Sequence, residues 1–135
     1  LNKPVMERLN KALQATSERL TLNKDNNKAG SEEKATLTAT IMAKNMSNVA
    51  INRMYYDVTV LNDKGEQLYS YPEHYQGSIA PGQAVELTTS KKLNSMLPDD
   101  KKLMNLDITK ETVKIQVTYI AFDNGEVISP KGLIE

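Results

Sequence analysis

Apolar and polar residues alternate along much of the chain, which is the pattern of β-strands that bury one face. The segment "ATLTATIMA", residues 35–43, is the first such stretch. Its threonines share one face, and the other face carries Leu37, Ala39, Ile41 and Ala43. This alternation predicts a half-buried strand whose threonines face water.

Two later pairs of strands are predicted to form hairpins. "AINRMYYDVTVL" (50–61) and "EQLYSY" (66–71) are separated by "NDKG", in which Asp63 and Gly65 suit a tight turn. "TVKIQVTYIAF" (112–122) leads through "DNGE", with its favourable Asn-Gly pair, into "VIS". The residues predicted to share one face are Met54, Tyr56, Val58 and Val60 in the first long strand, and Val113, Ile115, Val117, Tyr119 and Ala121 in the second.

The start of the chain follows a helical period instead. "PVMERLNKALQATSERL" spaces its apolar residues near helical intervals, and Pro4 is tolerated in a first helical turn. We therefore expect an amphipathic helix from Pro4 to Arg19 that packs on its own domain. Two alternatives stay open. Either the helix is a stalk or a partner-binding element, or the end of the stretch, "SERLTLNK", forms a first strand.

Polar loops and one short helix separate these elements. "NKDNNKAGSEEK" (23–34) indicates a solvated loop or linker, and "SMLPDDKKLM" predicts a brief helical crossing. We therefore divide the chain into a helix with its polar linker (1–30) and one β-domain (31–135). Several short strands joined by turns are typical of a sandwich. The predicted fold class is mainly β, an immunoglobulin-like antiparallel β-sandwich of about seven strands with an N-terminal helix.

Composition and charge argue against several classes of partner and chemistry. The 135 residues suit one domain, and 17 basic side chains balance 17 acidic ones, so the net charge does not favour nucleic acid as a partner. The chain has no cysteine, which excludes disulfides, thiolate metal sites and cysteine nucleophiles within it. No apolar run approaches the roughly 18 residues of a transmembrane helix.

The order of strands and turns from Ala35 to Ser129 resembles that of a known family. The matching residues are Asn45, Ser47, Asn48 and Ile51 after the first strand, Asp63 and Gly65 in the hairpin, and Pro81 and Gly82 in a later turn. They resemble the small immunoglobulin-like domains of bacterial envelope proteins and lipoproteins, including the FxLYD type. At the position of the FxLYD motif, this chain has Thr59, Leu61, Asn62 and Asp63 in place of Phe, Leu, Tyr and Asp. The resemblance implies a non-catalytic accessory or interaction module outside the cytoplasm, and it supplies no functional residues.

The stretch "YSYPEHYQGS" (69–78) holds three of the six tyrosines and the single histidine of the chain. Alternation places Tyr69 and Tyr71 on one face of a strand, with Tyr75 beyond Pro72. Clustered tyrosines beside a carboxylate and an imidazole can grip a peptide or stack on a sugar ring. Alternatively, the tyrosines cover the rim of the core, and Pro72 protects a sheet edge. The candidate contact residues are Tyr69, Tyr71, His74 and Tyr75, with Tyr55 as a weaker addition.

No arrangement of metal-ligating or catalytic residues stands out. His74 has no second histidine or cysteine to complete a metal site. "NDKGE" and "FDNGE" each place two carboxylates around a turn, where turn formation is the simpler role. Their similarity predicts two hairpins of like geometry. Nucleophile and phosphate-binding motifs are absent. We therefore predict no catalytic residues, no metal site, no cofactor and no enzymatic activity.

The expected function is that of a non-catalytic binding module, with a protein or an envelope component as its partner. The resemblance implies the bacterial cell envelope, either the periplasm or the surface. Because the chain begins with Leu1 rather than methionine, we expect a mature or shortened form, which fits the removal of an export or lipid-anchor segment. The alternative function is a carrier of a small ligand, either a sugar or a metal ion. The apolar stripe of the N-terminal helix also allows a homodimer.

Overall fold

The computed structural model describes residues 3–24 and 33–130. These residues form two α-helices, one 3₁₀ helix and seven strands. In chain order they are α1 (Lys3–Ala12), β1 (Leu13–Lys24), β2 (Lys34–Asn45), β3 (Ile51–Leu61), β4 (Gln67–Ile79), β5 (Ala84–Asn94), α2 (Pro98–Met104), η1 (Ile108–Lys110), β6 (Thr112–Phe122) and β7 (Val127–Ile128). The boundary predicted at residue 30 and most of the predicted polar linker lie outside the described residues.

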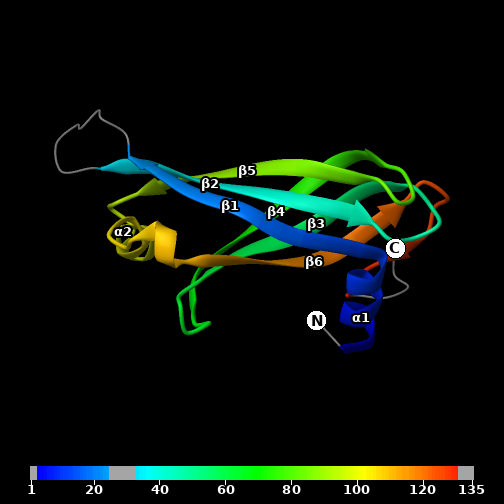
Figure 1. The fold of residues 1–135 in the computed structure, drawn as a ribbon, viewed down its shortest axis with the longest axis horizontal. Coiled ribbons are helices and arrows are strands. Elements are labelled where there is room, and N and C mark those ends of the chain that lie inside the picture. The colour runs from blue at the N-terminus through cyan, green and yellow to red at the C-terminus, as the bar shows by residue number, and fades with distance from the viewer. Residues whose placement is uncertain (1–2, 25–32, 131–135) are drawn as a thin grey trace.

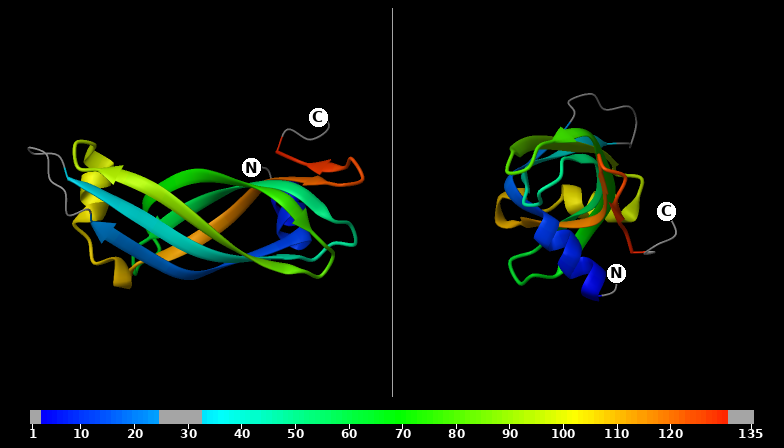
Figure 2. Two further views of the ribbon diagram at one scale, coloured as in Figure 1. Left: turned by 90° about the horizontal axis from the view of Figure 1, so that it is seen from above. Right: turned by 90° about the vertical axis from the view of Figure 1, so that its right-hand side faces the viewer.

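The seven strands form two antiparallel sheets that face each other (Figure 1). One sheet has the order β1-β2-β5 and the other β4-β3-β6-β7. The right view of Figure 2 looks along the strands, and the left view shows α1 and α2 at opposite ends of them. This is the strand order of an immunoglobulin-like sandwich in which the fourth strand pairs with the third. The predicted fold class is confirmed: the protein is a mainly β sandwich of seven strands with an N-terminal helix.

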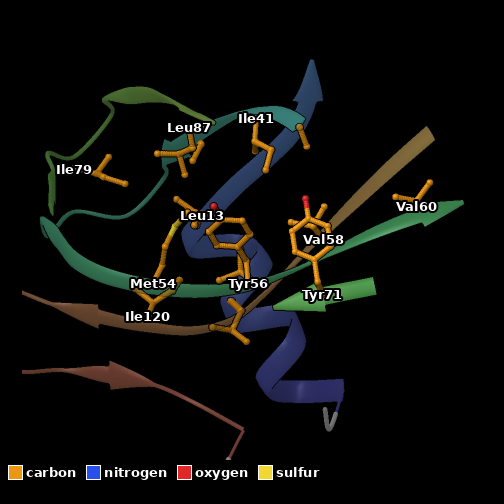
Figure 3. Close-up of a cluster of buried hydrophobic side chains, with 14 of the residues drawn as sticks. Leu13, Ile41, Met54, Tyr56, Val58, Val60, Tyr71, Ile79, Leu87 and Ile120 are labelled. Atoms are coloured by element: carbon orange, nitrogen blue, oxygen red, sulfur yellow. The ribbon is translucent and has the colours of Figure 1, made fainter. Parts of the chain in front are cut away.

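The side chains between the two sheets form one continuous hydrophobic core. The residues predicted to share one face of β2 and β3 are all buried: Leu37, Ala39, Ile41, Ala43, Met54, Tyr56, Val58 and Val60. Figure 3 shows Ile41 and Leu87 of the three-stranded sheet facing Val58 of the other. Burial of such apolar surface, worth roughly 25 cal/mol per Å², is what holds the two sheets together.

The N-terminal helix is shorter than predicted, because it ends at Ala12 instead of Arg19. Residues from Leu13 onward form β1, which pairs with β2 along its whole length. The helical prediction was wrong here because Leu20 and Leu22 also fit the period of a strand, and local spacing does not report the pairing that β2 offers. The alternative in which "SERLTLNK" forms a first strand is confirmed.

The remaining helix packs on its own domain, as predicted. Leu9 is fully buried in the core cluster, and Met6 is half-buried. The backbone N–H of Met46 donates to the carbonyl of Ala12 at 2.8 Å, which ties the end of α1 to the loop after β2. Much of the apolar stripe is therefore used within one chain, and a homodimer through this helix stays a prediction.

A bulge in β6 changes which of its side chains face the core. In the pairing with β3, Thr118 is left without an opposite residue between Val117 and Tyr119. Val117 points inward as predicted, but beyond the bulge Ile120 and Phe122 are buried instead. The prediction that Tyr119 shares a face with Val117 was therefore wrong. A bulge shifts the alternation by one residue, and the apolar pattern of this strand fits either phase.

One buried amide fixes the loop between β2 and β3. The Asn45 side-chain nitrogen donates to the carbonyls of Val49 and Ile79, both at 2.8 Å. Its oxygen accepts from the backbone N–H of Ser47 at 2.9 Å and from the Ser47 hydroxyl at 2.7 Å. Asn45 is fully buried and both ends of its amide are bonded, so the loop is held firmly against the end of β4.

The β3–β4 and β6–β7 hairpins have the like geometry that the sequence predicts. In one loop the backbone N–H of Asn62 donates to the carbonyl of Glu66 at 2.9 Å. In the other, the N–H of Phe122 donates to the carbonyl of Glu126 at the same distance. The glycine of each loop, Gly65 or Gly125, has a positive φ, of 80° and 92° respectively. In each loop an asparagine, Asn62 or Asn124, donates its side-chain N–H to the closing glutamate, at 3.0 Å and 2.9 Å.

Candidate functional site

The tyrosine-rich stretch lies inside β4, which continues through Pro72 to Ile79. β4 is an edge strand that pairs only with β3, which is where a proline is tolerated in a sheet. Alternation divides the candidate residues between the two faces of this strand. Tyr69 and Tyr71 share a face, as predicted, and point toward the core, whereas His74 lies on the outer face.

Tyr71 is a structural residue that joins the two sheets. It is 4% exposed, and its hydroxyl shares a hydrogen bond of 2.9 Å with the hydroxyl of Thr89 on β5. Burial raises the pKa of the Tyr71 phenol, and the nearby Glu73 carboxylate raises it further, while the bond to Thr89 acts in the opposite direction. Both sides of this contact are buried, so Tyr71 is closed to a partner.

Tyr69 connects β4 to the short helix α2. Its ring lies 6.1 Å from that of Tyr71, and its hydroxyl is hydrogen-bonded to Asp100. Burial, followed by this bond and the charge of Asp100, raises the pKa of Tyr69 to about 12. Asp100 also accepts a hydrogen bond, at its Oδ2, from the backbone N–H of Asn94 at 3.0 Å. Tyr69 therefore anchors α2 to the sandwich.

Tyr75 is half-buried and lies opposite Met54, which places it on the inner face of the sheet. Its ring lies against Gly77 of the same strand, where an added Cβ would stand 2.7 Å from the Tyr75 hydroxyl. The glycine therefore leaves room for the ring, a pairing that covers an exposed backbone at a sheet edge. Of the five candidates, three face inward along β4.

The remaining two candidates meet on the outer face of the four-stranded sheet. His74 and Tyr55 are opposite each other on β4 and β3, and Tyr119 is opposite Tyr55 on β6. Tyr55 and Tyr119 stack with ring centroids 5.0 Å apart and an interplanar angle of 27°. His74 meets Tyr55 edge-on, with centroids 6.1 Å apart and planes at 77°. These three rings, the aromatic row, cross three strands.

The aromatic row is accessible and lies beside two shallow hollows. Tyr55 is 42% exposed, and His74 is exposed as well. One hollow, of about 300 Å³, lies between Tyr55, Asp57, Glu73 and His74. The other, of about 340 Å³, includes Arg53 and Gln76, which pair in the next row of the sheet. Asp57 therefore places a carboxylate on one side of the aromatic row, and the Arg53 guanidinium lies on the other.

Sequence reasoning missed Tyr119, because the bulge at Thr118 turns it to the outer face. The wrong phase assigned to β6 hid a stacking partner for Tyr55. Arg53 was also missed as a residue of the row next to His74, because that placement requires the register of β3 with β4. A strand register is set by pairing, which the local pattern of one strand does not reveal.

Within residues 3–24 and 33–130, no group of three or more histidine, cysteine, aspartate or glutamate side chains is placed to hold a metal ion. The turns "NDKGE" and "FDNGE" lie at opposite ends of the β3–β6 pair, where Leu61 is opposite Thr112 and Ile51 is opposite Phe122. Their carboxylates therefore do not converge. No helix of the described residues is long and apolar enough to span a bilayer.

Comparisons with known proteins assign no family to the chain. No family model matches the chain, and no curated protein matches it. The X-ray structure of Northeast Structural Genomics Consortium target SoR45 is 14% identical with a TM-score of 0.48, over 94% of this chain and 93% of that one. The structure of the putative ApaA protein from Bordetella pertussis is 14% identical with a TM-score of 0.41, over 87% and 86% of the two chains. We draw no conclusion about fold or function from likenesses at this level.

Proposed function

We propose that the chain is a non-catalytic binding module that docks a protein partner on the outer face of the β4-β3-β6-β7 sheet. The observation that carries this proposal is the aromatic row of His74, Tyr55 and Tyr119. Tyrosine and arginine are enriched among the residues that dominate protein interfaces, and Arg53 lies in the adjacent row. A row of three rings with a neighbouring guanidinium has the composition of such a contact centre.

The geometry of the rings favours a protein over a sugar. A sugar stacks on an open ring face, but Tyr55 and Tyr119 stack on each other, and His74 meets Tyr55 edge-on. The row therefore offers ring edges, hydroxyls and an imidazole, which suit the mixed polar and apolar side chains of a protein surface. The contacts between the rings also hold them in place, so that binding costs less side-chain entropy.

The test is site-specific photo-crosslinking in the cells from which the chain comes. A photoreactive phenylalanine analogue replaces Tyr55 in one variant and Thr38 in a control variant. Thr38 lies on the outer face of the other sheet, opposite Thr21 and Ser90. We expect a discrete protein adduct from position 55 that is lost when Tyr119→Ala is added, and no such adduct from position 38.

Two outcomes would overturn the proposal. The first is that position 55 forms no adduct in cells where the folded chain is abundant. The second is that positions 55 and 38 form the same adducts. An adduct with the mass of two chains would assign the partner as a second copy of this chain. A solution dimer that the substitution Tyr55→Ala separates, while Met6→Ala does not, would place that contact on the sheet face and not on α1.

We also propose, from the resemblance to envelope domains, that the module works in the bacterial cell envelope. Fractionation of the source cells is the check. Recovery of the chain with periplasmic or membrane material would support this location, and recovery with the cytoplasmic proteins alone would contradict it. The binding proposal does not depend on this result, because it rests on the geometry of the sheet face.

A further inference from the structure

A second site lies at the end of the sandwich where α1, the loop between β2 and β3, and the β6–β7 hairpin meet (Figure 1). A hollow of about 400 Å³ is present there, which is within the size range of small-ligand pockets. It is separate from the aromatic row and independent of the proposed protein contact. The residues that line its apolar part are Ala12, Met46, Val49, Phe122 and Ile128.

The walls of this hollow are held by hydrogen bonds. The wall from the β2–β3 loop is fixed by Asn45, whose side chain bonds to Ser47 and Val49. The end of α1 is joined to it through Met46 and Ala12. The hairpin wall is closed by the bond from the N–H of Phe122 to the carbonyl of Glu126. Because these bonds fix its walls, the hollow needs little rearrangement to take a ligand.

The mouth of the hollow combines an exposed apolar side chain with positive charge. Met46 is 51% exposed and lines the hollow, and thioethers adapt to ligands of irregular shape. Arg8 and Lys11 also line the hollow, and their spacing of three places them on one side of α1. The hairpin contributes one acid, Glu126. The lining therefore carries an excess of one positive charge.

We propose that this hollow binds a single-chain anionic amphiphile, a fatty acid in its free form. The apolar lining takes the hydrocarbon chain, because moving methylene groups from water onto an apolar surface is favourable. The carboxylate lies at the mouth beside Arg8 and Lys11, where an arginine matches the planar carboxylate geometry. No covalent step is involved. The site would give the module a ligand in addition to its protein partner.

The test is isothermal titration of the whole chain with three single-chain probes below their critical micelle concentrations. Dodecanoate carries a negative head, dodecyltrimethylammonium a positive head, and dodecyl maltoside a neutral one. We expect saturable binding of one dodecanoate per chain, at least about tenfold tighter than either other probe. In the double variant Arg8→Glu/Lys11→Glu we expect dodecanoate binding to weaken by at least about tenfold.

A matched control reverses the same charge at the other end of the molecule. Lys101→Glu/Lys102→Glu changes two exposed lysines of α2, and we expect it to leave dodecanoate binding unchanged. Met46→Asp places a carboxylate at the mouth and should abolish binding, whereas Met46→Leu should retain it. Circular dichroism verifies that each variant is folded.

Several results would overturn the proposal. One is that the folded wild-type chain shows no saturable binding heat with dodecanoate. Another is that all three probes bind with equal affinity. A third is that the charge reversals on α1 and on α2 weaken dodecanoate binding equally. Binding of dodecanoate only as part of anionic vesicles, and not as free monomer, would assign the surface to a membrane instead. Displacement of bound dodecanoate by a peptide with an apolar C-terminus, at a lower concentration than dodecanoate requires, would assign it to a protein end.

Discussion

Two groups of aromatic side chains lie on opposite faces of the same sheet and differ in what holds them. Tyr71 is 4% exposed and is hydrogen-bonded to Thr89 of the other sheet. Tyr55 is 42% exposed and is held by Tyr119 and His74 of its own sheet. The inner tyrosine therefore connects the two layers, whereas the outer one leaves part of its ring for a partner. The two roles differ because successive side chains of a strand point to opposite faces of the sheet.

The largest expected effect is that of removing the inner ring. Tyr71→Ala leaves a cavity between the sheets and a buried Thr89 hydroxyl without its partner, so we expect a loss of about 3–5 kcal/mol in the free energy of unfolding. Tyr71→Phe removes the hydroxyl alone and should cost about 1–2 kcal/mol. Urea denaturation followed by circular dichroism measures both values.

The matched change on the outer face is Tyr55→Ala, which should cost only about 1–2 kcal/mol because the side chain is 42% exposed and its removal leaves no cavity between the sheets. The order of these two losses is the decisive result. If Tyr55→Ala destabilises the chain as much as Tyr71→Ala does, the outer ring is a packing residue, and the comparison between the two faces fails.

The same comparison shows where sequence reasoning works in this protein. Alternation assigned the inner faces of β2 and β3 correctly, because a strand with one buried face has no freedom of parity. The Asn-Gly and Asp-x-Gly turns were found because a tight turn with positive φ requires glycine. The split of "YSYPEHYQGS" between two faces also follows from alternation, once the strand is known to continue through Pro72.

Elements that depend on distant pairing were predicted only in part, as with the end of β1, which the sequence allowed only as an alternative to helix. β1 looked helical because its own residues fit either period, and only the ladder with β2 decides the outcome. The bulge at Thr118 has no local signature, so the stacking of Tyr119 on Tyr55 was hidden. The hollow beside α1 joins residues from three distant segments, such as Arg8, Met46 and Ile128, which no motif brings together.

A smaller effect is expected from the coupling within the aromatic row. A double-mutant cycle of Tyr55→Ala and Tyr119→Ala should give a coupling free energy of about 0.5–1.5 kcal/mol, the usual worth of a stacked pair beyond its buried area. Urea unfolding of the four proteins measures it. The control cycle combines Tyr55→Ala with Tyr71→Phe, which lie on opposite faces, and should be additive within about 0.5 kcal/mol.

A coupling close to zero in the first cycle would mean that the two outer rings are near each other without supporting each other. The aromatic row would then not be a preordered contact surface, and the entropy argument for the proposed interface would lose its basis. Equal coupling in both cycles would instead indicate that substitutions on either face act through a general loosening of the sheet.

The smallest effect concerns alkaline pH and separates the two faces by their chemistry. The pKa of Tyr69 is raised to about 12, and burial also raises the pKa values of Tyr56 and Tyr71. The folded state thus favours the neutral phenol. The corresponding stability is fully present below the unfolded pKa of about 10 and is lost as pH rises from there through the folded values.

We therefore expect the urea midpoint of the wild type to fall as pH rises from about 10, the unfolded tyrosine pKa, toward the folded pKa of Tyr69 at about 12. The urea midpoint of Tyr69→Phe should be lower than that of the wild type at pH 8, because the variant lacks the bond to Asp100. It should then decline less steeply with rising pH, because the variant has one ionisable phenol fewer. Parallel declines in the two proteins would show that Tyr69 does not resist ionisation. In that case its bond to Asp100 would not be the anchor that fixes α2 to the inner face of the sheet.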